Sequence, residues 1–268
     1  MAKLTRPIFL LTDFGLDDTY AGQVKAVIAG IAPAASIFDL SHAVSPFAIE
    51  EGAWLLETAL QALPANAVVL GVVDPGVGTV RREIVIASGG RLFVGPDNGL
   101  LSAAFGEGTP GLARTGSTDV RELCAPEFRR PHVSATFHGR DIFAPAAAHL
   151  ANGVDYRMMG PPVTGVTVLP PFGATTGAPG ELQAKVIHID RFGNLITTVR
   201  AAQLFPSFEI TVGATLIDRR VHTFAEAPEG LPFCHADSSG FIAIAVNCGS
   251  AAETLGARPG DAVTVRAR

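Results

Sequence analysis

Short β-branched runs alternate with helix-like stretches through the first half of the chain. Residues 7–11, 36–39 and 67–73 favour strands, and between them residues 19–32 and 49–63 carry apolar side chains at helical spacing. This alternation is typical of βαβ units, in which a helix joins two parallel strands. It predicts an α/β fold whose N-terminal domain is a mostly parallel sheet with flanking helices.

The composition changes at residues 160–180, which hold five prolines and five glycines. Such a stretch suits an extended connector better than a packed element. After it come short alternating runs with no strong helix between them, a pattern typical of small antiparallel sandwiches and barrels. We therefore predict an N-terminal α/β domain over residues 1–160, a connector over 161–180, and a smaller antiparallel, barrel-like β domain over 181–268.

The overall composition limits the class of protein. With 48% hydrophobic and 17% charged residues, the 268-residue chain can bury a sizeable core. Its formal net charge of −5 and the lack of a long basic run argue against nucleic acid as the main partner. No stretch reaches the ~20 apolar residues of a membrane helix. Cys124, Cys234 and Cys248 show neither disulfide-framework nor zinc-ligand spacing, so we expect a cytoplasmic protein.

The first predicted strand ends in a cluster of acidic residues, Asp13, Asp17 and Asp18. Open α/β sheets bind ligands at the carboxyl ends of their strands, so these carboxylates are candidates for a site. Either Asp17 or Asp18 could instead cap the helix that follows. Asp13 could bind ribose hydroxyls, an ammonium group or a metal, and the spacing does not choose among them.

The segment DPGVGTVRR follows an apolar strand and places Asp74 seven positions before Arg81. A carboxylate beside a guanidinium stays ionised at neutral pH. Gly76 and Gly78 resemble a phosphate cradle, but the Lys-Ser/Thr of a P-loop does not follow, so that interpretation fails. A simple tight turn is the alternative.

A third candidate segment, FHGRD, places His138 in a loop ahead of a helix predicted to start near Asp141 and end at Gly153. A histidine between a strand and a helix can reach a site, whereas His149 has apolar neighbours at helical spacing and is predicted to lie in the core. There is neither an HExxH motif nor a close histidine pair, so we expect no required metal.

In the predicted second domain, polar residues stand near strand ends, where each could also serve a turn. They are Asp190, Asn194, Ser238, Ser239 and Asn247. The Gly-Asn pair at 193–194 in particular suits a hairpin turn.

The chain resembles the S-adenosylmethionine hydroxide adenosyltransferase family in blocks that follow one another along nearly its whole length: TDFGLDD, DPGVGTVRR, GPDNGLLS, FHGRDIFAPAAAHLA, IDRFGNLITT and FIAIAVNCGSAAE. The same family includes fluorinating and chlorinating enzymes that act on S-adenosylmethionine (SAM). The resemblance implies an N-terminal α/β domain, a C-terminal β domain, and a homotrimer with sites between adjacent subunits.

The resemblance also assigns residues. The trio of the hydroxide-using members falls on Asp74, Arg81 and His138, which implies hydrolysis of SAM to adenosine and L-methionine by attack of a water-derived oxygen on ribose C5′. SAM is then the substrate, and no cofactor is implied. The implied substrate contacts are Asp13 and Phe47 at the ribose, Asp17, Thr19, Asp190 and Ser238 at the methionine, Asn194 and the Cys248 backbone at the adenine, and Phe137 and Phe192 along the ligand.

The implied reaction needs a base but no general acid, because methionine leaves a cationic sulfonium as a neutral group. Water has a pKa near roughly 15.7 and is a poor nucleophile without a metal or a base. Asp74 or His138 could take the proton while Arg81 orients the water. We favour Asp74 as the base and His138 as the positioning group, although an adjacent arginine weakens an aspartate as a base, so both assignments stay open.

Two other functions remain as alternatives. A halogenase of the same family would use halide as the nucleophile, and the presence of Asp74, Arg81 and His138 argues against it. A non-catalytic protein that binds SAM or a nucleoside would show binding without product. A methyltransferase is disfavoured because TDFGLDD has one glycine where a nucleotide-binding fingerprint needs three.

Overall fold

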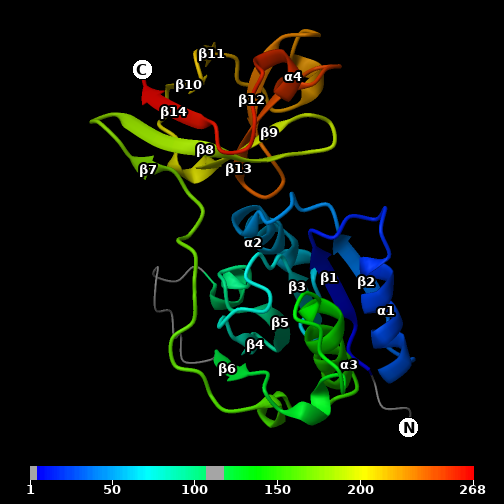
Figure 1. The fold of residues 1–268 in the computed structure, drawn as a ribbon. Helices are drawn as coiled ribbons and strands as arrows, with labels where there is room; N and C mark the ends of the chain where they lie inside the picture. Colours follow the sequence, from blue (N-terminus) through cyan, green and yellow to red (C-terminus); the bar gives the residue numbers. More distant parts are fainter. Residues whose placement is uncertain (1–4, 107–117) are drawn as a thin grey trace. The chain divides into compact units, whose positions relative to one another are not determined.

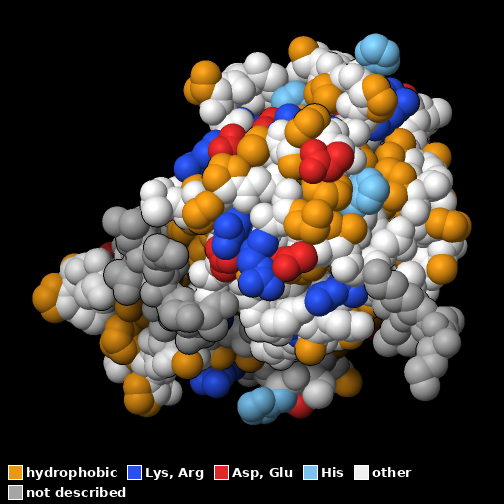
Figure 2. Space-filling view, turned by 90° about the horizontal axis from the view of Figure 1, so that it is seen from below, with side chains coloured by type: hydrophobic (Ala, Val, Ile, Leu, Met, Phe, Trp, Pro, Cys, Tyr) orange, Lys and Arg blue, Asp and Glu red, His pale blue; other side chains and the backbone are white. Residues whose placement is uncertain are grey.

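The structure, a computed structural model, describes residues 5–106 and 118–268. The chain divides into two compact units, Met1–Pro171 and Phe172–Arg268, each with its own sheet (Figure 1). None of the helices in the described parts of the chain has the length and apolar character needed to cross a membrane. On the face shown in Figure 2, acidic and basic side chains lie close together, with hydrophobic side chains scattered among them.

The first unit contains a six-stranded mixed sheet in the order β2-β1-β3-β5-β4-β6. Its strands are β1 (Ile8–Thr12), β2 (Ile37–Ser41), β3 (Val68–Val72), β4 (Glu83–Ser88), β5 (Arg91–Pro96) and β6 (Asp119–Glu122). The β2, β1, β3 and β5 strands are parallel, while β4 is antiparallel to both β5 and β6. The reversal at β4 follows from Gly89 and Gly90, whose positive φ angles of 56° and 83° make a two-residue hairpin turn.

Helices cover both faces of this sheet, as Figure 1 shows. They are α1 (Tyr20–Ile31), α2 (Ile49–Ala59) and α3 (Ala144–Ala151), the last preceded by the π-helical turn η4 (Gly139–Phe143). Alternation along β1 sends Leu10 into a core with α1 and α3, and Leu11 into a second core with α2. The predicted α/β class, with its mostly parallel sheet, is therefore confirmed.

Short 3-10 turns connect the larger elements. In chain order they are η1 (Leu60–Ala62), η2 (Ser102–Phe105), η3 (Pro126–Phe128), η5 (Tyr156–Met159), η6 (Ala201–Gln203) and η7 (Phe224–Glu226). The proline-rich stretch after η5 is hydrogen-bonded to the first unit. Thr167 N donates to Asp97 Oδ1 (2.7 Å) and Leu169 N donates to Ser102 Oγ (2.8 Å).

The second unit is an all-antiparallel sheet in the order β11-β10-β14-β8-β9-β13-β12, with β7 paired to β8. Its elements are β7 (Thr175–Thr176), β8 (Glu181–Ile189), β9 (Leu195–Arg200), β10 (Phe208–Val212), β11 (Thr215–Ile217), β12 (Pro232–Ala236), β13 (Phe241–Val246), the short helix α4 (Ala251–Leu255) and β14 (Ala262–Ala267). Residues after β11 bond to β12, since Val221 N donates to Cys234 O (3.2 Å), so the sheet curls toward a barrel. The predicted antiparallel β domain is confirmed.

Candidate active site

A pocket of about 620 Å³ lies in the first unit where the parallel strands β1 and β3 end. This is the edge at which an α/β sheet offers its ligand site. Five of the residues singled out from the sequence line it: Asp13, Phe47, Asp74, Phe137 and His138. Sequence reasoning missed other lining side chains, among them Phe14, Tyr20, Gln23 and Arg140.

Asp13 follows β1 and holds the loop that enters α2. Its Oδ2 accepts a hydrogen bond from the Phe47 N–H (2.9 Å). This bond secures Phe47 in a left-handed conformation (φ 67°), which is unusual for a residue with a side chain. Burial raises the pKa of Asp13, the negative charge of Asp74 adds to the rise, and the Phe47 hydrogen bond opposes it.

Asp74 and Arg81 form a nearly dry ion pair at the same edge. Arg81 Nε donates to Asp74 Oδ1 (2.9 Å) and its Nη2 donates to Oδ2, so both carboxylate oxygens are engaged. The two side chains are only 5% and 9% exposed, respectively. The turn between them also bonds internally, with Val77 N donating to Asp74 O (3.2 Å), so the tight-turn interpretation is confirmed and the site interpretation stays a prediction.

A glycine brings this turn against the segment that carries His138. Gly78 has φ 75°, and a Cβ placed on it would lie 2.4 Å from Ala135 O. Only glycine permits that approach. As a result Arg81 Nη2 reaches His138 Nδ1 at 2.9 Å, and the trio predicted from the resemblance is one hydrogen-bonded cluster.

The surroundings of His138 favour its neutral form. Burial lowers its pKa, and the positive charge of Arg81 lowers it further, against the opposing effects of Glu83 and Asp74. Its loop is anchored by the fully buried Asp141, which accepts from Ser134 N (2.9 Å) and from Arg130 Nη1 (3.0 Å). Burial alone would raise the pKa of Asp141, but hydrogen bonds from Arg140, Ser134 and Arg130 lower it to about 2.

Two charged residues that sequence reasoning missed complete the cluster. Glu83 Oε1 accepts from Arg81 Nη1 (3.0 Å), and Glu83 Oε2 accepts from Arg129 Nη2 (3.3 Å). Glu83 Oε1 also lies 3.1 Å from His138 Nδ1. By contrast, the second arginine of the DPGVGTVRR segment, Arg82, pairs with Asp97 through its Nε (2.9 Å) and does not join the cluster.

The acidic residues after Asp13 stand apart from this pocket. Asp17 and Thr19 are exposed and are not among the residues that line it. The capping interpretation of Asp17 or Asp18 is wrong, because the N-cap of α1 is Thr19 and it makes no side-chain capping bond. Thr19 Oγ1 instead accepts from Gln23 Nε2 (2.9 Å), one turn along the helix.

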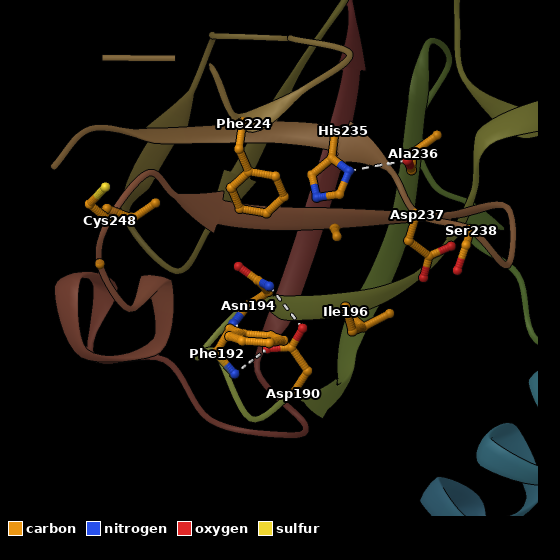
Figure 3. A pocket seen from close by; sticks show the side chains of 13 residues that line it. Asp190, Phe192, Asn194, Ile196, Phe224, His235, Ala236, Asp237, Ser238 and Cys248 are labelled. Carbon is orange, nitrogen blue, oxygen red and sulfur yellow. Dashed lines mark hydrogen bonds between the residues drawn. The ribbon is translucent and has the colours of Figure 1, made fainter. Parts of the chain in front are cut away.

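The second unit has a pocket of about 710 Å³ of its own (Figure 3). All five second-unit residues assigned by the resemblance line it: Asp190, Phe192, Asn194, Ser238 and Cys248. Asp190 organises the β8–β9 turn, because its Oδ1 accepts from Phe192 N and Asn194 N (both 2.9 Å) and its Oδ2 accepts from Asn194 Nδ2 (2.8 Å). The turn role and the pocket role therefore coincide.

Three aromatic rings line this second pocket, those of Phe192, Phe224 and His235. Phe192 is 78% exposed, and Phe224 of η7 lies near His235 of β12, with ring centroids 5.3 Å apart. His235 Nδ1 donates to Ala236 O (3.1 Å), as Figure 3 shows. Sequence reasoning missed Phe224, His235 and Asp237, because a lone Phe and a His-Ala-Asp run in a loop-rich region carry no spacing signal.

Among the residues that the structure describes, no group of three or more His, Cys, Asp and Glu side chains is arranged to hold a metal ion. The three cysteines are free thiols, with Cys234 buried and Cys124 and Cys248 exposed.

Residues 8–160 match the SAM hydroxide adenosyltransferase N-terminal domain, and residues 184–264 match the C-terminal domain of the same family. The chain belongs to this family. The resemblance predicted from the sequence blocks is confirmed over both domains.

Relatives within the family carry two kinds of name. The chain is 44% identical to an (R)-S-adenosyl-L-methionine hydrolase of Thermus thermophilus, covering 95% of this chain and 97% of the relative. It is 40% identical to a protein of the same name from Salinispora tropica, covering 97% of each. A fluorinase of Actinopolyspora mzabensis is more distant, at 24% identity over 97% of each. A crystal structure of an uncharacterized conserved protein from Thermotoga maritima matches with a TM-score of 0.86 and 34% identity, covering 97% of this chain and 100% of that one.

Proposed function

We propose that this family member hydrolyses SAM to adenosine and L-methionine. The observation that carries the proposal is the cluster of Asp74, Arg81 and His138, joined by hydrogen bonds at the pocket where β1 and β3 end. The names of its relatives at 40–44% identity support the same reaction.

For this reaction the protein must align a water molecule with C5′ and provide a group that accepts one proton from it. A water O–H bond breaks, an O–C5′ bond forms, and the C5′–S bond breaks with its electron pair remaining on sulfur. Methionine leaves as a neutral thioether, so no acid is required. Holding water in line with C5′ supplies much of the rate, because it removes the entropic cost of bringing the reactants together.

The geometry favours His138 as the base, in place of the Asp74 assignment preferred from the sequence. Asp74 uses both oxygens to hold Arg81, so its role is to orient the guanidinium. Burial and the charge of Arg81 lower the pKa of His138, which favours the neutral imidazole that a base requires, and the His138 side chain lines the pocket. Arg81 Nη2 lies 2.9 Å from His138 Nδ1 and brings positive charge beside the developing hydroxide.

The proposed substrate contacts are those that the family resemblance implies, and all of them except Asp17 and Thr19 line one of the two pockets. In the first unit, Asp13 binds the ribose hydroxyls and Phe47 and Phe137 pack along the sugar side. In the second, Asn194 and the Cys248 backbone meet the adenine beside Phe192. The remaining contacts, all with the methionine end, are Asp17, Thr19, Asp190 and Ser238, whose oxygens suit its α-ammonium group.

Product identification tests the proposal. The purified protein is incubated with SAM in heavy-oxygen water, with and without chloride and a chelator. Heavy-oxygen adenosine plus methionine in every buffer is the expected result. A 5′-halogenated adenosine would identify a halogenase, and tight binding without product would identify a SAM-binding protein, so either result would overturn the proposal.

The oligomeric state and the compartment are part of the proposal. We infer a homotrimer with sites between subunits from the family resemblance, and light scattering that gives a mass near three times the 27.8 kDa chain is the expected result. We infer a cytoplasmic location from the three free thiols and a small-molecule, not a nucleic-acid, partner from the net charge of −5. A stable monomer would contradict the trimer.

A further inference from the structure

The GPDNGLLS block is one of those on which the family resemblance depends, yet no residue in it has a role in the proposed reaction. It begins at the end of β5 and places Asp97 and Asn98 next to each other in the chain. Neither is among the residues that line the pocket where β1 and β3 end. Their side chains bond instead to the two ends of the segment that contains Asp74 and Arg81.

The Asn98 side chain fixes the backbone immediately before Asp74. Its Nδ2 donates to Val73 O (2.8 Å), and its Oδ1 accepts from Leu100 N (3.1 Å). A backbone carbonyl only accepts and a backbone N–H only donates, so these two partners define the orientation of the amide. Val73 is completely buried and lies one residue past the end of β3, where the pairing with β1 stops. A buried carbonyl outside a ladder needs another donor, and Asn98 supplies it.

Asp97 fixes the other end of the segment through Arg82. Arg82 O accepts from Asp97 N (3.0 Å) and Arg82 Nε donates to Asp97 Oδ2 (2.9 Å), so Arg82 is bonded through both its backbone and its side chain. The Asp97 side chain is only 3% exposed. Its other oxygen accepts from Thr167 N (2.7 Å), and Arg82 Nη2 donates to Gly165 O (2.6 Å). These bonds hold the residue directly beside Arg81.

The segment between these two ends is not rigid by composition. Gly76 and Gly78 lie in it, and the Val80 side chain is fully exposed. Glycine adopts more backbone conformations than other residues, so such a segment loses more entropy when it is ordered. Its ends must be fixed if Arg81 is to meet both oxygens of Asp74, and a misplacement of about 1 Å can lower a rate by roughly 10²-fold.

We propose that Asp97 and Asn98 are positioning residues for the buried ion pair of the first pocket. Asn98 fixes the backbone that leads into Asp74. Asp97 fixes Arg82 and thereby the backbone that leaves Arg81. The inference rests on the proposed function only in taking this ion pair as part of the machinery that aligns the attacking water. It gives neither positioning residue a contact with substrate or a proton to exchange.

NMR of the Arg81 guanidinium tests this without substrate. In ¹⁵N-arginine-labelled protein, the Arg81 Nε–H signal is identified by its loss in Arg81→Lys. Because this N–H donates to Asp74 Oδ1, its exchange with water should be slow in the wild type. Asn98→Ala and Arg82→Gln should each speed the exchange by roughly two- to tenfold, which is about the net strength of one hydrogen bond.

A second variant separates the two bonds of the Asn98 amide. Asn98→Asp keeps an acceptor for Leu100 N but has no donor for Val73 O. It should therefore speed the Arg81 Nε–H exchange as Asn98→Ala does. Exchange at the wild-type rate in Asn98→Asp would mean that the bond to Val73 O does not position the ion pair.

Two matched controls remove the same kinds of bond elsewhere in the first unit. Asn152 Nδ2 donates to Ile31 O (2.9 Å), and Arg121 Nη2 donates to Asp119 Oδ2 (2.9 Å). Asn152→Ala and Arg121→Gln should leave the exchange of the Arg81 Nε–H at the wild-type rate. A general loss of stability would instead speed it in the controls as well, which would overturn the inference.

The inference is also overturned if Arg81 exchanges at the wild-type rate in folded Asn98→Ala and Arg82→Gln. If the Asn98 variants do not fold, Arg82→Gln decides alone. Faster exchange in Arg82→Gln then supports the positioning role, and exchange at the wild-type rate overturns it.

Kinetics then separate this inference from the proposed reaction. Asn98→Ala and Arg82→Gln should lower kcat by roughly ten- to a hundredfold with little change in KM, because the ion pair aligns water and does not bind SAM. If SAM is not hydrolysed but the NMR result holds, the proposed function fails and the positioning role stands. If SAM is hydrolysed and both variants keep the wild-type kcat, the positioning role fails.

Discussion

The two pockets of this chain are formed by different kinds of side chains. The pocket of the first unit lies beside a buried polar network, in which Asp74, Glu83 and His138 each bond to Arg81. The pocket of the second unit is lined by three aromatic rings, by small apolar and polar side chains, and by a turn whose Asp190 bonds to backbone N–H groups. The first suits proton transfer and charge stabilisation, and the second suits recognition of a flat, apolar ligand surface.

The comparison predicts that substitutions in the first pocket change turnover and that substitutions in the second change affinity. The largest expected effect is at His138, the proposed base. His138→Gln should lower kcat by roughly 10²–10⁴-fold, because general base catalysis contributes about that much. SAM affinity by calorimetry should stay close to that of the wild type. An equal loss of SAM affinity and of kcat would mean that His138 contributes to substrate binding, which would contradict the difference between the pockets.

The free energy of unfolding should also respond differently to substitutions in the two pockets. Asp74→Ala removes the carboxylate that bonds twice to the buried Arg81 guanidinium and leaves Glu83 as its remaining acidic partner, which costs up to about 3–5 kcal/mol. Asp190→Ala removes hydrogen bonds at a partly exposed turn and should cost about 1–3 kcal/mol. Urea denaturation of the two variants measures the difference, and an equal loss in both would contradict the distinction between the pockets.

The free energy of unfolding of the first unit should also fall at acid pH. The pKa of Asp141 is lowered to about 2 in the folded protein, so its contribution is present above the unfolded-state pKa near 3.8 and is lost as pH falls through about 2. This linkage amounts to about 2 kcal/mol. Asp141→Asn should unfold more readily than the wild type at neutral pH, and the gap should shrink below pH 3.8. A gap that stays constant with pH would rule out the linkage.

The smallest expected effect is at the exposed aromatic of the second pocket. Phe192→Ala should raise KM for SAM by roughly 2- to 10-fold with kcat unchanged, since an aromatic pair contributes about 0.5–1.5 kcal/mol. Because Phe192 is 78% exposed, the free energy of unfolding should hardly change. Initial-rate kinetics measure both constants. A fall in kcat alone would mean that this residue aligns the reacting atoms.

Local sequence patterns were sufficient where one element carries its own signal. The helices α1 and α2 were predicted because their apolar residues recur at helical spacing. The strands β6 (Asp119–Glu122) and β12 (Pro232–Ala236) were missed, since the first is short and charged and the second begins with proline. Their pairing partners, β4 and β13, are what make them strands.

The site shows the same limit. Asp74, Arg81 and His138 could be named from the DPGVGTVRR and FHGRD blocks, because glycine-rich turns after a strand place side chains at a sheet edge. Glu83 could not be named, since it stands at the start of an ordinary apolar strand. Its partner Arg129 is 46 positions away, and only the fold brings the two together.

The sequence by itself determined the alternation of strands and helices, the change to an antiparallel domain, and the family, because these depend on residues close together in the chain. The tertiary structure alone decided which charges meet. The contact of Gly78 with Ala135 O brings Arg81 to His138, and the pairing of β4 within the sheet brings Glu83 to the same ring nitrogen. Hydrogen bonds and charge interactions act over a few ångströms in space, so the chemistry of the cluster exists only once the chain has folded.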